Sequence, residues 1–134
     1  MSYARQMLST NPRSKSVSAD ALVAAIEALS DCSQACSADT SANLGEKDLA
    51  EMVTCIRLCL DCAGICDVTL AILSRMTEPD RKVTRPLLES CIAICDSCGA
   101  ECERHAKMHE HCRVCGEACR RCERACRELL TAIK

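Results

Sequence analysis

The chain of 134 residues is long enough to bury one hydrophobic core and too short for two, yet it has no Phe, no Trp and a single Tyr. Its formal net charge of −2, with acids and bases interspersed and no aromatic residues among the basic ones, argues against a nucleic-acid partner. Its 15 cysteines are an odd number, which fits a fully disulfide-bonded secreted domain poorly.

The N-terminal segment, residues 1–17, is expected to form an arm with a short helix over about Ser2–Ser9, ended by Asn11 and Pro12. This segment has no apolar run of the length found in secretory signals. Nowhere does the chain approach the roughly eighteen apolar residues of a membrane span. We therefore expect a cytoplasmic protein without a membrane partner, whose thiols stay reduced.

Two long helices with cysteines on one face are predicted next. The first begins at Ser18 as N-cap and ends at Gly45, and the second spans about Glu46–Met76 until the sequence TEPD breaks it. Cysteines alternate at spacings of four and three residues, which is the period of one helix face, so they form stripes of thiols. The cysteines of these two helices are Cys32, Cys36, Cys55, Cys59, Cys62 and Cys66.

Two further cysteine-bearing helices complete the chain. The third is expected to start near Thr84, with Pro86 in its first turn, and to end at His105 or His109. The connection to the fourth is weakly marked, because HAKMHEH contains no Gly, Pro or Asn. The cysteines of these helices are Cys91, Cys95, Cys98, Cys102, Cys112, Cys115, Cys119, Cys122 and Cys126.

Short connections between these helices predict an all-α fold, an antiparallel up-down four-helix bundle over residues 18–134, with the short extra helix in the N-terminal arm. This topology sorts the core by chemistry. One end becomes an apolar plug made of Leu22, Ile26, Leu29, Leu70, Leu73, Leu87, Leu88, Leu129, Leu130 and Ile133. The other becomes a metal entrance made of Cys36, Asp39, Met52, Cys102, His105, Met108, His109, His111 and Cys112.

Thiols at this density predict a soft metal. Cysteines at i and i+4 hold their Cβ atoms about 5 to 6 Å apart, beyond the roughly 3.8 Å of a disulfide. Cu(I) fits best, because it prefers thiolates and accepts two-coordinate sites. Zinc is the main competitor, but here the CxxC pairs lie mid-helix rather than on turns. An iron–sulfur cluster is disfavoured because the cysteines do not have the usual ferredoxin spacing. A thioredoxin-type redox pair is disfavoured because the sequence predicts no strand before it. If the cysteines only filled core space, their sulfur would not be needed.

The entrance residues are weighed separately. If the third helix runs on, His105 and His109 continue its thiol stripe, and we expect both to bind metal. His111 stays undecided. Met52 is expected to be core filler rather than a metal contact, and Asp39 a solvated acid. The arginines of the last helix are expected to form its wet face.

The stripes CIRLCLDCAGIC, CIAICDSCGAEC and CRVCGEACRRCERAC resemble the bacterial copper storage proteins, four-helix bundle copper-binding proteins, over roughly residues 18–134. The resemblance, to the cytosolic branch, implies a homotetramer of bundles whose thiolates hold many Cu(I) ions. It also implies copper-binding histidines at the open end, which CERHAKMH matches at His105 and His109. The first helix carries only the two cysteines Cys32 and Cys36, so the copper capacity is not copied from the family. Counted at about one Cu(I) per thiolate, it is on the order of fifteen ions per chain.

The function expected from these features is non-catalytic storage of Cu(I) in the cytosol, with uptake and release at the His/Met end. The partners expected are copper ions, a copper chaperone or small-thiol donor, and further copies of the chain. A zinc or general thiol metal buffer is the alternative. An enzyme is disfavoured, because the sequence offers no evident acid and base pair or open metal position.

Overall fold

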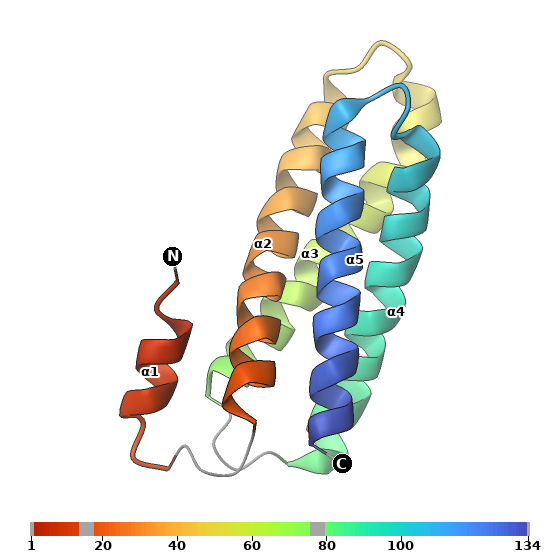
Figure 1. The fold of residues 1–134 in the computed structure, drawn as a ribbon. Coiled ribbons are helices and arrows are strands. Elements are labelled where there is room, and N and C mark those ends of the chain that lie inside the picture. The colour runs from red at the N-terminus through yellow and green to blue at the C-terminus, as the bar shows by residue number, and fades with distance from the viewer. Residues whose placement is uncertain (1, 14–17, 76–79, 134) are drawn as a thin grey trace.

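The computed structural model describes residues 2–13, 18–75 and 80–133. This part of the chain contains five helices and no strand: α1 (Ala4–Thr10), α2 (Ala19–Leu44), α3 (Leu49–Ser74), α4 (Arg81–His105) and α5 (Glu110–Ala132). The four long helices run side by side, alternately up and down, and α1 lies outside the bundle against α2 (Figure 1). The all-α, antiparallel four-helix bundle with a short extra helix is therefore confirmed.

The predicted ends of α2 are confirmed by its capping residues. Ser18 is the N-cap, and its Oγ accepts a hydrogen bond from the Ala21 amide at 3.5 Å. Gly45 is the C-cap, and its amide donates to the Ala42 carbonyl at 3.1 Å. The next helix, α3, begins at Leu49 rather than Glu46. Residues 46–48 instead form a turn that keeps two acidic side chains at this end of the bundle.

The predicted start of α4 was too late. Asp80 caps the helix, with its Oδ1 accepting from the Lys82 amide at 3.0 Å. Pro86 therefore lies inside the helix rather than in its first turn, where it has no amide hydrogen to donate to the Lys82 carbonyl. Most of the predicted TEPD break, residues 77–79, lies outside the described residues.

The connection between the last two helices is also settled. α4 ends at His105, residues 106–108 form a turn, and His109 is the N-cap of α5. His109 therefore does not continue the thiol stripe of α4, which corrects the expectation for a longer helix. Its position at the start of α5 brings it instead toward the turn between α2 and α3.

The core divides along the bundle axis as predicted. The apolar plug lies at the end where α2 and α4 begin, and six of its ten residues are buried while the other four are half-buried. Each buried Leu or Ile contributes roughly 1.5 to 3 kcal/mol. The buried members are Leu22, Leu29, Leu73, Leu88, Leu129 and Ile133. Beyond the plug the core consists mainly of cysteine.

The arginines of α5 lie on its wet face as expected. Arg120 binds Asp96, Glu103 and Glu123 at 2.7 to 2.9 Å. Its guanidinium lowers the pKa of the Glu103 carboxyl. Arg113, Arg121 and Arg127 also pair with surface acids, so none of the described ion pairs of α5 places an arginine against the thiols.

Candidate metal centre

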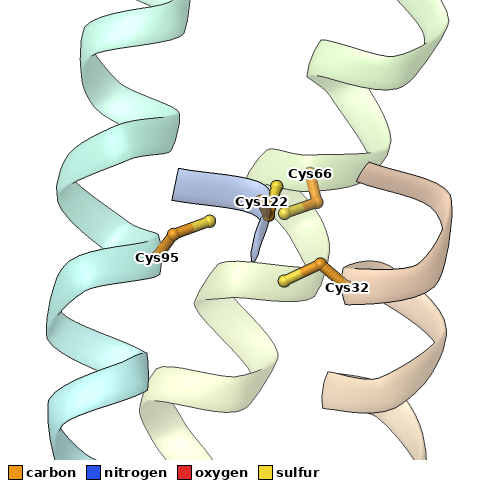
Figure 2. A group of neighbouring side chains, drawn as sticks. All are labelled: Cys32, Cys66, Cys95 and Cys122. Atoms are coloured by element: carbon orange, nitrogen blue, oxygen red, sulfur yellow. The ribbon is translucent and has the colours of Figure 1, made fainter. Parts of the chain in front are cut away.

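The fifteen cysteines form one buried array, here called the sulfur column. Every thiol is free, and none is more than 1% exposed. The column runs along the bundle axis because the four-three alternation keeps each cysteine on the inward face of its helix. Figure 2 shows Cys32, Cys66, Cys95 and Cys122, one from each long helix, with their sulfurs turned toward one another.

Neighbouring sulfurs in the column are close enough to share a metal ion. The Sγ atoms of Cys59 and Cys98, and those of Cys36 and Cys115, are 3.7 Å apart. Within one helix, the Sγ atoms of Cys62 and Cys66 are 3.9 Å apart. These contacts are well beyond the roughly 2.05 Å of a disulfide bond, so the column is a set of reduced donors.

The donors form overlapping sets rather than separate sites. Four sulfurs lying within 4.8 Å of one another recur along the column, and successive sets share members. Cys36 and Cys119, for example, belong both to the set with Cys32 and Cys62 and to the set with Cys98 and Cys115. Shared thiolates bridge metal ions, so the geometry supports a continuous chain of ions instead of isolated centres.

Charge distinguishes the metals that such a column can hold. Among the described residues, no lysine or arginine is buried. Three Zn(II) ions on twelve thiolates would leave a net charge of about −6 in the core, which is costly without a buried cation. One Cu(I) per thiolate leaves a charge of about zero. The column is therefore electrically matched to a monovalent soft metal.

Asp39 continues the column toward the solvent, which corrects the expectation of a solvated acid. It is 1% exposed, and its Oδ2 accepts from the thiols of Cys59 at 3.5 Å and of Cys55 and Cys102 at 3.8 Å. With these three cysteines it forms a further four-donor set. Burial, above all, raises the pKa of the Asp39 carboxyl.

At the mouth, defined here as the end that carries Glu46, Asp48, His109 and His111, histidines contact carboxylates. His111 places Nδ1 2.6 Å from Asp39 Oδ1 and Nε2 2.7 Å from Glu46 Oε2. His109 places Nδ1 3.0 Å from the same Glu46 oxygen and Nε2 3.2 Å from Asp48 Oδ2. The undecided His111 thus lies next to the column, with Nδ1 also 3.6 Å from the Cys112 sulfur.

The charges at the mouth shift two of its groups in the same direction. Burial opposes protonation of His111, but its contacts with Glu46 and Asp39 outweigh that effect and raise its pKa. Burial also raises the pKa of the Cys112 thiol, and the nearby Asp39 charge adds to this effect. A proton on either group is therefore held more firmly than in an isolated side chain.

His105 lies apart from this cluster of contacts. It is the last residue of α4, and its Nε2 is 2.8 Å from Glu101 Oε2. The structure thus brings His109 and His111 together through Glu46, but gives His105 a separate carboxylate partner one turn earlier on its own helix.

Comparison with known proteins agrees with this chemistry. The family model described as copper storage protein matches residues 18–131. The chain belongs to the copper storage protein family. No curated protein matches it.

Solved structures of copper storage proteins share the fold. The Streptomyces lividans protein Ccsp, loaded with 10 copper equivalents, is 47% identical and superposes with a TM-score of 0.92, covering 96% of this chain and 98% of that one. A cytosolic copper storage protein from Streptomyces lividans with five coppers is 50% identical, with a TM-score of 0.83 over 86% and 96% of the two chains. The Cu(I)-bound storage protein BsCsp3 is 33% identical, with a TM-score of 0.71 over 79% and 94%.

In this copper storage family member, Asn43 is a buried site residue that the sequence analysis missed. Its Nδ2 lies 3.4 Å from the Cys55 sulfur, and its Oδ1 accepts from Cys112 at 3.5 Å. The signal was present, because Asp39 and Asn43 follow Cys36 at spacings of three and four, the alternation that marks the thiols themselves. The acids Glu46, Asp48 and Glu101 were also missed. Glu46 and Asp48 lie in a turn and carry no such signal, whereas Glu101 lies three residues after Cys98 and four before His105.

Met52 is fully buried beside the column, and Met108 is 80% exposed.

Within the described parts of the chain, no helix is both long and apolar enough to cross a bilayer.

Proposed function

We propose that this chain stores Cu(I) in its sulfur column, with on the order of fifteen ions on fifteen thiolates. One observation carries the proposal: every cysteine is buried in an uninterrupted array whose four-sulfur sets share members. A protein that needed one structural metal would use four of these thiols and leave the others without a purpose. Seventeen side chains are proposed as copper contacts: the fifteen cysteines, His105 and His109.

Copper passes through the mouth in this proposal. The opposite end is closed by buried leucines, whereas His109 and His111 are 11% and 28% exposed. For a histidine to take an incoming ion it must release its carboxylate, Glu101 for His105 and Glu46 or Asp48 for His109. Histidine ligands of this kind would pass copper inward to sulfur, which holds Cu(I) more strongly than nitrogen does.

Each Cu(I) that binds a thiol displaces one proton, and Asp39 is placed to receive it. Its Oδ2 faces the thiols and its Oδ1 faces His111, which in turn contacts the 30% exposed Glu46. Because ligands must be deprotonated, copper affinity should rise with pH toward the thiol pKa. The apolar plug supports a bundle that already folds without metal.

The remaining features of the proposal concern the whole protein. We infer that residues 18–134 are the storage bundle and that residues 1–17 are an arm. We also infer that the protein works in the cytosol, like the Streptomyces relative described as cytosolic. In this proposal it catalyses no reaction. A copper chaperone or a small thiol would supply the metal. A homotetramer is supported by apolar side chains on the outer face of α3, where Val53, Leu60 and Val68 are about half exposed.

Zinc competition tests the storage proposal against a zinc or thiol buffer. The reduced protein is loaded with Cu(I) without oxygen, exposed to a large excess of Zn(II), desalted, and analysed for both metals. We expect copper to remain, because fifteen monovalent ions neutralise the column and a few divalent ions do not. Replacement of most of the copper by zinc would overturn the proposal.

A further inference from the structure

The mouth contains a donor set unlike that of the column. Its side chains offer imidazole nitrogens and carboxylate oxygens, donors that suit borderline and hard cations, whereas the column offers sulfur to soft ones. Two of the histidines converge on one oxygen: Glu46 Oε2 is 2.7 Å from His111 Nε2 and 3.0 Å from His109 Nδ1. The rings of His109 and His111 are nearly parallel, with an angle of 20° between their planes and 5.4 Å between their centroids.

We propose that Glu46, His109 and His111 form a binding site for a divalent first-row cation such as Zn(II), separate from the Cu(I) column. Ligand atoms about 2.1 Å from a tetrahedral ion lie about 3.4 Å apart. The two measured contacts, at 2.7 and 3.0 Å, are about 0.7 and 0.4 Å shorter than that spacing, so the three side chains need to move apart only slightly to hold an ion. The site goes beyond the storage proposal, because it takes a different class of metal. It shares His109 with the proposed copper contacts, so the two metals would compete for that side chain.

The second nitrogen of each histidine supports this assignment. His109 Nε2 contacts Asp48 Oδ2 at 3.2 Å, and His111 Nδ1 contacts Asp39 Oδ1 at 2.6 Å. A carboxylate on the far side of the ring fixes the tautomer, so that the other nitrogen presents its lone pair to a metal. Both histidines therefore carry the outer carboxylate that metal-binding histidines usually have.

The charge at the mouth also favours a cation. Within the described chain, the ion pairs of Asp39, Glu46 and Asp48 all go to histidine and none to lysine or arginine. When the histidines are neutral, three carboxylates share this small region without a permanent positive partner. Glu46 and Asp48 are 30% and 32% exposed, so a bound ion could keep a water ligand on its open side.

Cobalt(II) is the probe, since its spectrum distinguishes nitrogen and oxygen ligands from sulfur. The reduced, metal-free chain is titrated without oxygen at about pH 7.5, above the usual histidine pKa, where burial still keeps the neighbouring Cys112 thiol protonated. We expect one Co(II) per chain, with visible d–d bands and no sulfur-to-cobalt charge-transfer band. Glu46→Gln should weaken binding by about tenfold or more. The exposed Glu51, in the first turn of α3, gives the matched control Glu51→Gln, which should bind like the unaltered chain.

Two results would overturn the site. The first is that the unaltered chain binds no cobalt. The second is that the unaltered chain and Glu46→Gln bind cobalt equally well, as they would if the ion bound to sulfur in the column. Circular dichroism and the Cu(I) capacity of each variant are measured in parallel. A helical Glu46→Gln chain that still takes up its full copper load has a folded column, so its loss of cobalt would report on the mouth alone. A low Cu(I) capacity in the unaltered chain would count against the store and leave the cobalt result standing.

Discussion

At the residue scale, Asp39 connects the two chemistries of the protein. One of its oxygens faces the thiols of the column, and the other contacts His111 at the mouth. A buried carboxylate beside thiols is costly in the metal-free protein, because burial disfavours its charge and the charge disfavours thiolate formation nearby.

The contacts of His111 predict a pH-dependent stability. Glu46 and Asp39 raise the pKa of this histidine, so its protonated form is the one that the folded state favours. The stabilisation is complete below the unfolded pKa of about 6.5 and is lost as pH rises through the folded value. In thermal unfolding of the metal-free protein, His111→Gln should lower Tm by roughly 2–4 °C near pH 5.5 and by less at pH 8.5. A difference that grows with pH would contradict this.

The sequence predicts the thiols of the site far better than its other groups. Each cysteine lies where helical periodicity requires, so composition and spacing suffice. Asp39 was misjudged because an acid at one end of a helix is usually solvated, and only the neighbouring helices reveal that it is covered. His109 and His111 both contact Glu46, which lies 63 and 65 residues earlier in the chain. These contacts depend on how the two helix connections at this end face each other, and residue spacing within one helix cannot predict that.

At the element scale, capping residues define the helix ends better than proline does. Ser18, Gly45 and Asp80 all act as caps, whereas placing Pro86 in a first turn started α4 too late. A proline inside a helix is compatible with the fold when packing along the rest of the helix offsets one missing hydrogen bond. The start of α4 was therefore a choice between two local signals, and tertiary packing decided it.

Two glycines in the packed faces of α4 and α5 should respond differently to alanine. A Cβ on Gly116 would lie 3.5 Å from Cys102 Cβ, an ordinary contact, so Gly116→Ala should stabilise the protein by about 0.5–1 kcal/mol. A Cβ on Gly99 would lie 3.1 Å from Arg120 Nε, and three carboxylates hold that arginine in place. Gly99→Ala should therefore gain less or lose stability. Chemical denaturation of both variants measures this, and an equal gain would argue against the Arg120 contact.

The plug can be weakened without touching the column. Leu88 is fully buried in it, so Leu88→Ala should lower the free energy of unfolding by about 2–5 kcal/mol. Copper capacity should stay unchanged if the metal-free chain remains folded, since no thiol is altered. The exposed Val83 on the same helix is the control, and Val83→Ala should change stability by less than about 1 kcal/mol. A similar loss in both variants would show that the plug does not stabilise the bundle as described.

At the scale of the whole molecule, antiparallel topology separates an apolar end from a polar one. This separation follows from the order of residues along each helix, and the sequence predicts it because short connections leave few alternative arrangements. Packing determines what the sequence leaves open, namely which outer faces remain apolar. The outer face of α3 carries Val53, Leu60 and Val68 around Gly64, and a Cβ on that glycine would meet nothing within 4 Å.

This face should be a contact between copies of the chain. Leu60 is 55% exposed, and Leu60→Glu should reduce the size of the assembly in analytical ultracentrifugation, because a charge would be buried at the contact. Val114 on α5 is 47% exposed and serves as the matched control, so Val114→Glu should leave the assembly unchanged. An unaltered chain that sediments as a monomer would contradict the tetramer, and equal effects of both variants would place the contact elsewhere.

The central claim is that the whole sulfur column stores copper. The most direct measurement is an anaerobic titration of the fully reduced protein with Cu(I), followed by gel filtration and a count of copper and thiols in the protein fraction. We predict binding near one copper per cysteine, on the order of fifteen ions per chain, since every thiol lies in the shared array. Saturation at about three or four metals per chain would mean separate tetrathiolate sites and would contradict the store.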